Sequence, residues 1–207
     1  MKKHRVFIGI LISMILLFVS TLFYPGGSQN NINTVGYDWQ HNYISNLFSW
    51  TAINGQASNS PIWAAGGMFV LSYSFSLFFI RFSQKIPVKS ASLVIKYFGV
   101  AAMFFVFLAV TPYHDTMLMI AETVGLISLF YCTVFIFKTR FLGVKMLSLL
   151  LLMSIYASMY LYYSRSFIEI LPVAQKSSLA LNIIWVLILD YKISTADFNL
   201  IKISRKE

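Results

Sequence analysis

Six stretches of the chain are almost entirely apolar, and polar and charged residues gather between them and at the two ends. A helix needs about 20 apolar residues to cross a bilayer, and the stretches come close to that length. We therefore predict an all-α membrane protein, a single domain over residues 1–207 built as a bundle of six transmembrane helices. The predicted spans cover residues 6–24, 62–80, 93–110, 117–137, 146–163 and 171–191.

The first and last spans need further interpretation. The basic start before residue 6 resembles a signal peptide, but no small-x-small cleavage site follows, so a retained first helix is expected. The apolar stretch 179–189 is short for a span. It becomes long enough if the helix begins near Leu171, because Pro172 fits the first turn of a helix. Lys176 would then extend its ammonium toward the membrane interface.

The first loop, residues 25–61, is much longer than the others. Its second part, residues 37–50, has a helical pattern in which one face is apolar and the other polar. The apolar face contains Tyr43, Ile44, Leu47 and Phe48, and the polar face contains Asp38, His41, Asn42, Ser45 and Ser49. This pattern predicts an amphipathic helix that lies at the outer interface or caps the bundle.

The composition agrees with a membrane protein. Hydrophobic residues make up 58% of the chain and charged residues 11%, against about 25% charged in soluble domains. The mean hydropathy is +0.72. These values exclude a disordered chain, a coiled coil and an ordinary soluble domain. Cys132 is the single cysteine, which excludes an intramolecular disulfide and a thiolate metal cage.

The distribution of basic residues predicts the orientation. The net charge is +9, and six spans would place 14 of the 16 Lys and Arg residues on the side of both termini. Only Arg165 and Lys176 fall on the other side. Because cytoplasmic loops carry the excess of Lys and Arg, both termini are expected in the cytoplasm and the protein in the cytoplasmic (inner) membrane. No basic stripe interleaved with aromatic residues predicts nucleic-acid binding, so the expected partners are membrane lipids or other membrane proteins.

Ionisable residues near the hydrocarbon are the first candidates for chemistry, because they are costly there. The predicted catalytic residues are His114, Asp115 and Glu122. Asp115 and Glu122 are seven residues apart and share one helix face. Other interpretations stay open: Asp115 can cap the helix N-terminus, Glu122 can join helices as a hydrogen-bonded carboxyl, and His114 can be an ordinary interfacial residue.

A second group of candidates comes mostly from the long loop. The predicted binding residues are Asp38, His41, Asn42, Ser45, Asn46 and Tyr113. Together with the catalytic candidates they place imidazoles and carboxylates on the same side of the membrane, which suits general acid–base chemistry. The same groups could hold zinc or a similar metal through His41, His114, Asp115 and Glu122. No close metal-ligand spacing is present, so no cofactor is predicted.

Two short motifs resemble a known family. Residues 42–47 read Asn-Tyr-Ile-Ser-Asn-Leu, and residues 59–63 read Asn-Ser-Pro-Ile-Trp. They resemble the Frag/DRAM/Sfk group, and most closely its bacterial six-helix relatives of unknown function. In this chain Asn46 stands where an acid is common, and Glu122 stands near the expected place of a histidine. Because eukaryotic members are linked to lipid remodelling and membrane-lipid organisation, the resemblance implies a lipid-related role.

The sequence leaves the molecular activity open. One hypothesis is a non-catalytic bundle that binds lipid or a partner protein and has a polar site on its outer face. The alternative is a membrane-embedded hydrolase or lipid-remodelling enzyme that uses the outer-face His, Asp and Glu residues. A small transporter would need polar groups at the membrane midplane or broken helices, and the sequence offers few of them.

Overall fold

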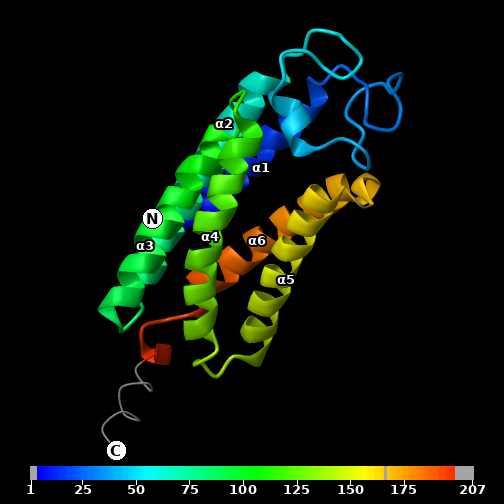
Figure 1. The fold of residues 1–207 in the computed structure, drawn as a ribbon. Helices are drawn as coiled ribbons and strands as arrows, with labels where there is room; N and C mark the ends of the chain where they lie inside the picture. Colours follow the sequence, from blue (N-terminus) through cyan, green and yellow to red (C-terminus); the bar gives the residue numbers. More distant parts are fainter. Residues whose placement is uncertain (1–3, 166, 199–207) are drawn as a thin grey trace, which may run out of the picture.

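The computed structural model describes residues 4–165 and 167–198, and these form six long helices (Figure 1). Each is long and apolar enough to cross a membrane, so the predicted six-helix, all-α fold is confirmed and a multi-pass membrane protein is indicated. Within the described residues, β-structure is limited to two isolated bridges in the long loop. The helices are α1 (Arg5–Leu22), α2 (Ser60–Ser83), α3 (Lys89–Leu108), α4 (His114–Ile136), α5 (Leu142–Ser164) and α6 (Leu171–Lys192).

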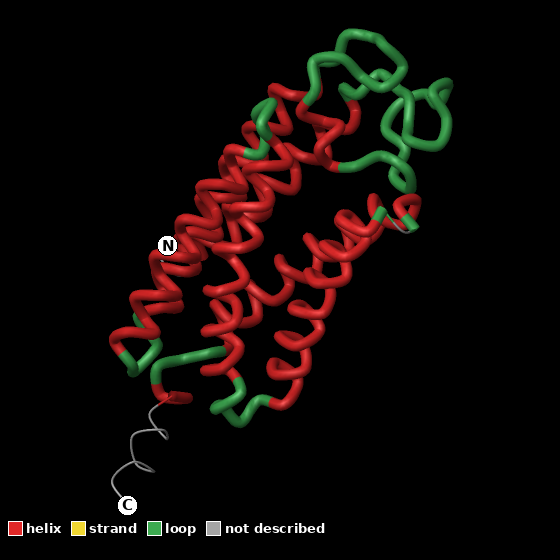
Figure 2. Tube along the Cα trace, in the orientation of Figure 1, coloured by secondary structure: helices red, strands yellow, loops and turns green. Residues whose placement is uncertain are grey.

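Small residues allow the first helices to pack closely. Gly67 of α2 lies against Leu17 of α1, and a Cβ atom at Gly67 would be 2.9 Å from Leu17 Cγ. Gly99 of α3 lies directly on the ring of Phe79 in α2. Such contacts let helix backbones approach each other inside a membrane. In contrast, α4 and α5 meet at the turn that joins them and diverge toward the end that carries the long loop (Figures 1 and 2).

The Gly99 contact gives a stability prediction. We expect Gly99→Ala to destabilise the protein by about 1–3 kcal/mol, because the new methyl group overlaps the Phe79 ring and displaces it. Gly143→Ala is the matched control, since nothing lies within 4 Å of a Cβ atom there, and a small gain of up to about 1 kcal/mol is expected. Thermal unfolding in detergent measures both. Equal stability of the two variants would contradict the proposed close contact.

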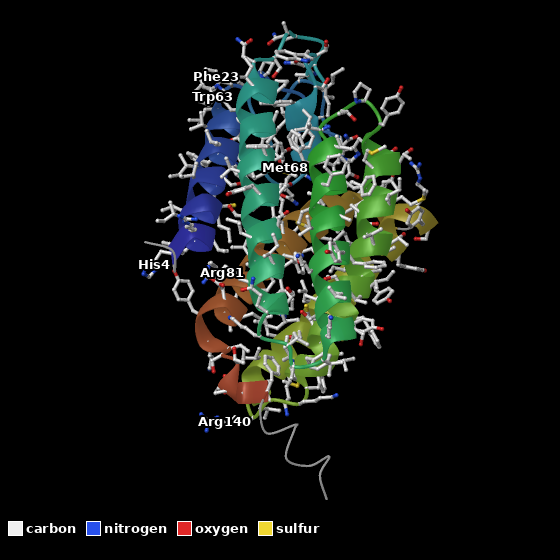
Figure 3. The ribbon with its side chains drawn as sticks, turned by 90° about the vertical axis from the view of Figure 1, so that its left-hand side faces the viewer. His4, Phe23, Trp63, Met68, Arg81 and Arg140 are labelled. Atoms are coloured by element: carbon white, nitrogen blue, oxygen red, sulfur yellow. The ribbon has the colours of Figure 1, made fainter. Side chains whose placement is uncertain are left out.

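The two ends of the bundle differ in character. At the end with the long loop, called the loop end here, Phe23 stacks on Trp63 with ring centroids 5.6 Å apart (Figure 3). Arg81 and Arg140 lie toward the opposite end (Figure 3). Between the ends, buried aromatic side chains fill the centre. Trp185 of α6 is fully buried and donates a hydrogen bond to Ser148 Oγ of α5 at 2.8 Å.

The amphipathic helix predicted over residues 37–50 does not form. That segment contains only the five-residue 3-10 helix η2 (Ile44–Phe48). It belongs to the folded loop of residues 23–59, called the cap here, which lies over the loop end (Figure 2). Two asparagines explain the difference, because their side chains take up backbone groups that a helix would use. Asn42 Oδ1 accepts from the Asp38 amide at 2.9 Å, and Asn46 Oδ1 accepts from the Tyr43 amide at 2.7 Å.

Two helix starts test further expectations. α6 begins at Leu171 with Pro172 in its first turn, as predicted. Lys176 differs, because its ammonium donates to the backbone carbonyls of Asn42 and Pro172 rather than extending outward, and so joins α6 to the cap. α4 begins at His114 with Tyr113 at the N-cap, so Asp115 lies in the first turn and the interpretation of Asp115 as the N-cap does not apply. Its carboxylate meets the neighbouring imidazole instead.

Candidate functional site

Two adjacent cavities lie toward the loop end, and one of them has a much more polar lining than the other. The first, called the polar cavity, has a volume of about 350 Å³ and is bordered by α4, α5, α6 and the cap. Its polar lining includes Tyr43, His114, Asp115, Glu122, Tyr162 and Arg165. The second, called the apolar cavity, has a volume of about 220 Å³ and lies deeper in the bundle. Its lining includes Met68, Phe75, Phe79, Met103, Val106 and Leu129.

The cavities share part of their walls. Ser45, His114, Leu118 and Gln175 line both of them. The polar cavity lies where α4 and α5 have diverged, so the helix arrangement itself creates the space between them (Figure 1). Gln175 also joins α6 to the cap, because its Oε1 accepts a hydrogen bond from the backbone amide of Ile44 at 3.1 Å. The two cavities are therefore adjacent, with these four residues between them.

His114 is the ionisable residue at the junction of the two cavities. Its Nδ1 lies 3.0 Å from Asp115 Oδ1, and its ring lies 6.5 Å from the ring of Phe48. The carboxylate fixes the orientation of the imidazole, so the second ring nitrogen is the one that can meet a ligand. The Asp115 side chain is 75% exposed, and the hydroxyl of Tyr162 on α5 lies beside its carboxylate.

Glu122 lies deeper on the same wall. It is seven residues after Asp115 on α4, about 10 Å further along the helix axis, and lines the polar cavity. Its side chain is partly buried. Across residues 4–165 and 167–198, no hydrogen bond or ion pair reaches its carboxylate. The structure thus brings together the three residues predicted as catalytic, while their chemical roles stay predictions.

Arg165 places a positive charge at the rim of the polar cavity. It ends α5 in the left-handed conformation, with φ of 56°, and its side chain is exposed. A left-handed residue commonly ends a helix, and Phe167 has the same conformation, so this φ marks the turn after α5. Sequence reasoning identified Arg165 only as one of two basic residues on the predicted outer side. The scarcity of basic residues on that side could have indicated a specific role for Arg165.

The predicted binding residues have different surroundings. Ser45 lines both cavities. Asn42 and Asn46 hold the cap together, and the buried Asn42 amide donates to the Gly27 carbonyl at 2.9 Å. Tyr113 is 71% exposed and lines neither cavity. Sequence reasoning missed Tyr43, Tyr162 and Gln175, because only the folded cap and the diverging helices bring them to the polar cavity.

In the cap, His41 Nδ1 lies within hydrogen-bond distance of Asp38 Oδ2, at 2.8 Å, and neither residue lines the two cavities. The structure therefore does not bring His41 to the cavity that holds His114 and Glu122. In the part of the chain that the structure describes, no three His, Cys, Asp or Glu side chains are arranged to hold a metal ion.

The Asp38 pair predicts a pH dependence of the cap. Burial works against ionisation of Asp38, but hydrogen bonds from the His41 ring and from the amides of Gln40 and His41 outweigh it and lower the pKa of the carboxyl. A lowered native pKa stabilises the fold above the unfolded pKa, and this contribution disappears as pH falls through the native value. We expect the Gln40 and His41 amides to lose protection below about pH 4. Hydrogen exchange corrected for intrinsic rates measures this, and Asp38→Asn should remove the pH dependence.

Comparisons of the chain with protein-family models, curated proteins and solved structures find no match. The resemblance of residues 42–47 and 59–63 to the Frag/DRAM/Sfk group therefore stays a prediction. In the structure these two segments form the start of η2 with its preceding turn and the start of α2. Ser60 joins them, because its hydroxyl donates to the Leu47 carbonyl at 3.0 Å.

Proposed function

We propose that this protein binds a membrane lipid, with the polar group of the lipid in the polar cavity and an acyl chain in the apolar cavity. One observation carries the proposal: the two cavities meet at residues that line both, among them His114 and Leu118. Polar and apolar volumes joined in this way match the two parts of an amphipathic molecule. The polar cavity is lined by α4 and α5, which diverge toward the loop end (Figure 1). This arrangement supports the entry of a lipid between the two helices from the surrounding bilayer.

The proposal includes an orientation. Because 14 of the 16 basic residues belong to the termini and the loops on their side, both termini lie in the cytoplasm and the cavities face the outer leaflet of the cytoplasmic membrane. The described basic residues of that group lie in helix ends and turns remote from the cap, such as Arg81 at the end of α2 and Lys145 at the start of α5. A lipid partner is thus expected from the outer leaflet.

The test uses a substitution at the junction. Leu118→Trp places a larger side chain where the cavities meet, and we expect it to prevent lipid binding. Leu150→Trp is the matched control, because Leu150 is 54% exposed on α5 and lines neither cavity. Native mass spectrometry of protein purified in a mild detergent measures the lipid retained. Titration with outer-leaflet lipids restores any lipid that purification removes.

The expected result is retained or rebound lipid on the wild type and on Leu150→Trp, with most of it lost from Leu118→Trp. Two results would overturn the proposal: a wild type that binds no lipid even after titration, or a Leu118→Trp variant that binds as much as the wild type. Size-exclusion chromatography distinguishes blocked binding from misfolding, because a misfolded variant leaves the monodisperse peak.

A second candidate function is lipid hydrolysis or remodelling, supported by the His114–Asp115 pair. The carboxylate orients the imidazole beside the junction of the cavities, an arrangement suited to a general base. Incubation with lipid vesicles should then release a headgroup or a fatty acid, and His114→Ala should abolish the release. Absence of any product from the wild type would rule out this second function and leave the lipid-binding proposal in place.

A further inference from the structure

The Glu122 carboxylate lines the polar cavity and has no partner among the described residues. It is partly buried on a membrane-spanning helix, and the described residues provide no hydrogen bond or ion pair for it. Ionisable groups at such depth are costly and usually serve a partner. Among described residues, the other carboxylate in the cavity differs, because Asp115 already meets the His114 imidazole and is mostly exposed.

Other groups that line the polar cavity favour a cation within it. Tyr43, Tyr162 and Tyr163 line the same cavity, and aromatic rings attract ammonium groups. The positive charge of Arg165 lies at the exposed rim rather than beside Glu122, since it comes from the end of α5. With the imidazole of His114 neutral, two carboxylates and one guanidinium leave the described lining with one excess negative charge.

We propose that the ligand carries an ammonium group, with Glu122 as its counter-ion and the apolar cavity as the site of its hydrocarbon part. This inference rests on the proposed function, because it names the chemistry of the molecule that fills the two cavities. An anionic headgroup is disfavoured beside Glu122, since it would face that carboxylate, although Arg165 at the rim could pair with a phosphate group of the same molecule. The ammonium can belong to a membrane lipid such as phosphatidylethanolamine or to a free long-chain amine.

The test compares three ligands with the same chain and different polar ends. Dodecylamine, dodecanol and dodecanoate are titrated against the purified full-length protein in a sugar-based detergent, and native mass spectrometry counts the bound molecules. We expect dodecylamine to bind most tightly. Glu122→Gln should weaken dodecylamine binding by about 30-fold or more, because it removes the charge of a partly buried pair, and should leave dodecanol binding unchanged.

Glu169→Gln is the matched control. Glu169 is exposed in the 3-10 helix η3 (Ile168–Ile170) at the same end of the bundle and lines neither cavity. This variant changes the net charge by the same amount, so it should bind dodecylamine as the wild type does. Equal weakening in Glu122→Gln and Glu169→Gln would overturn the proposal, since the effect would then reflect overall charge.

The outcomes separate this inference from the proposed function. If the wild type binds the three ligands equally, or if Glu122→Gln binds dodecylamine as tightly as the wild type, the ammonium proposal fails and lipid binding stands. If the wild type binds none of them and no lipid, the proposed function fails as well. Phosphatidylethanolamine and phosphatidylglycerol with identical chains distinguish the two sources of the ammonium group. A preference for phosphatidylethanolamine identifies a membrane lipid as the ligand. Tight binding of dodecylamine without that preference identifies a free amine.

A second measurement needs no variant and so survives any folding defect of Glu122→Gln. Dicyclohexylcarbodiimide reacts with carboxyl groups in apolar surroundings, and peptide mapping by mass spectrometry locates the modified residue. We expect labelling of Glu122 in the wild type, with stronger protection by dodecylamine than by dodecanol. Equal protection by the two ligands would contradict an ion pair at this carboxylate.

Discussion

Replacing Arg81 with methionine is expected to destabilise the protein by about 3–5 kcal/mol, because the Asp190 carboxylate then stays buried without its guanidinium. Arg81 of α2 and Asp190 of α6 form an ion pair, with 3.1 Å between Nη1 and Oδ2. The Asp190 side chain is only 2% exposed, and its Oδ1 has no hydrogen-bond partner among the described residues. Removal of the cation therefore leaves a nearly unsolvated charge at the end remote from the cap.

A double-mutant cycle identifies the cause of this loss. Adding Asp190→Asn to Arg81→Met removes the buried charge, so we expect the double variant to regain most of the lost stability. Unfolding by sodium dodecyl sulfate, followed by circular dichroism, measures each free energy. Arg140→Met is the control, because Arg140 is exposed at the same end and its loss should change the stability by no more than about 0.5 kcal/mol.

An absence of coupling in this cycle would contradict the ion pair. The neighbouring Lys85 is a second positive charge that interacts with Asp190, so we expect a loss near the lower end of this range. Its ammonium donates to the carbonyls of Leu189, Asp190 and Ile193 at 3.3, 3.2 and 2.8 Å. These charged side chains hold the end of α6 against the end of α2. Replacement of any one of them should therefore weaken the contact between the two helices.

The helices were predictable because each needs only local information. A continuous apolar stretch must cross the bilayer as a helix, since no water satisfies its backbone there. Pro172 marked the start of α6 for an equally local reason, because its fixed φ suits the first turn. These features depend on composition along the chain and not on which helices pack together, so a single sequence was sufficient.

The cap was less predictable because its structure depends on distant partners. Residues 37–50 have the spacing of an amphipathic helix, yet Asn42 and Asn46 bond to backbone groups and leave only η2. The Asn42 carbonyl also accepts from Lys176, which is 134 residues away in the sequence. Helical periodicity describes the faces of a helix once formed, but it does not include competing hydrogen bonds from another part of the chain.

In the candidate site, too, some features follow from the local sequence and others only from the packing of distant segments. His114, Asp115 and Glu122 were predictable because ionisable residues near an apolar stretch are conspicuous and their spacing places two of them on one face. The apolar cavity was not, because its lining of Met68, Phe79 and similar residues reads as ordinary core. The polar cavity was not predictable either, because it lies where α4 and α5 diverge and the angle between two helices has no signature in either helix alone.

The membrane orientation predicts opposite labelling of two introduced cysteines. The background is suitable because Cys132 is fully buried in α4 and should not react in the native protein. Asn30→Cys places a thiol on the exposed surface of the cap, and Ser90→Cys places one on the exposed start of α3 at the opposite end. If both termini are cytoplasmic, a membrane-impermeant maleimide should label Asn30→Cys in intact cells and leave Ser90→Cys unlabelled.

Permeabilised cells provide the control, because both cysteines should then react. Labelling of Ser90→Cys alone in intact cells would reverse the orientation and place the two cavities at the cytoplasmic leaflet. The lipid-binding geometry would be unchanged by that result, since it depends on the shared walls at His114 and Leu118 and not on the side of the membrane. The source of the ligand would change, because the lipids of the cytoplasmic leaflet would then meet Glu122. The labelling pattern therefore determines which leaflet supplies the ligand.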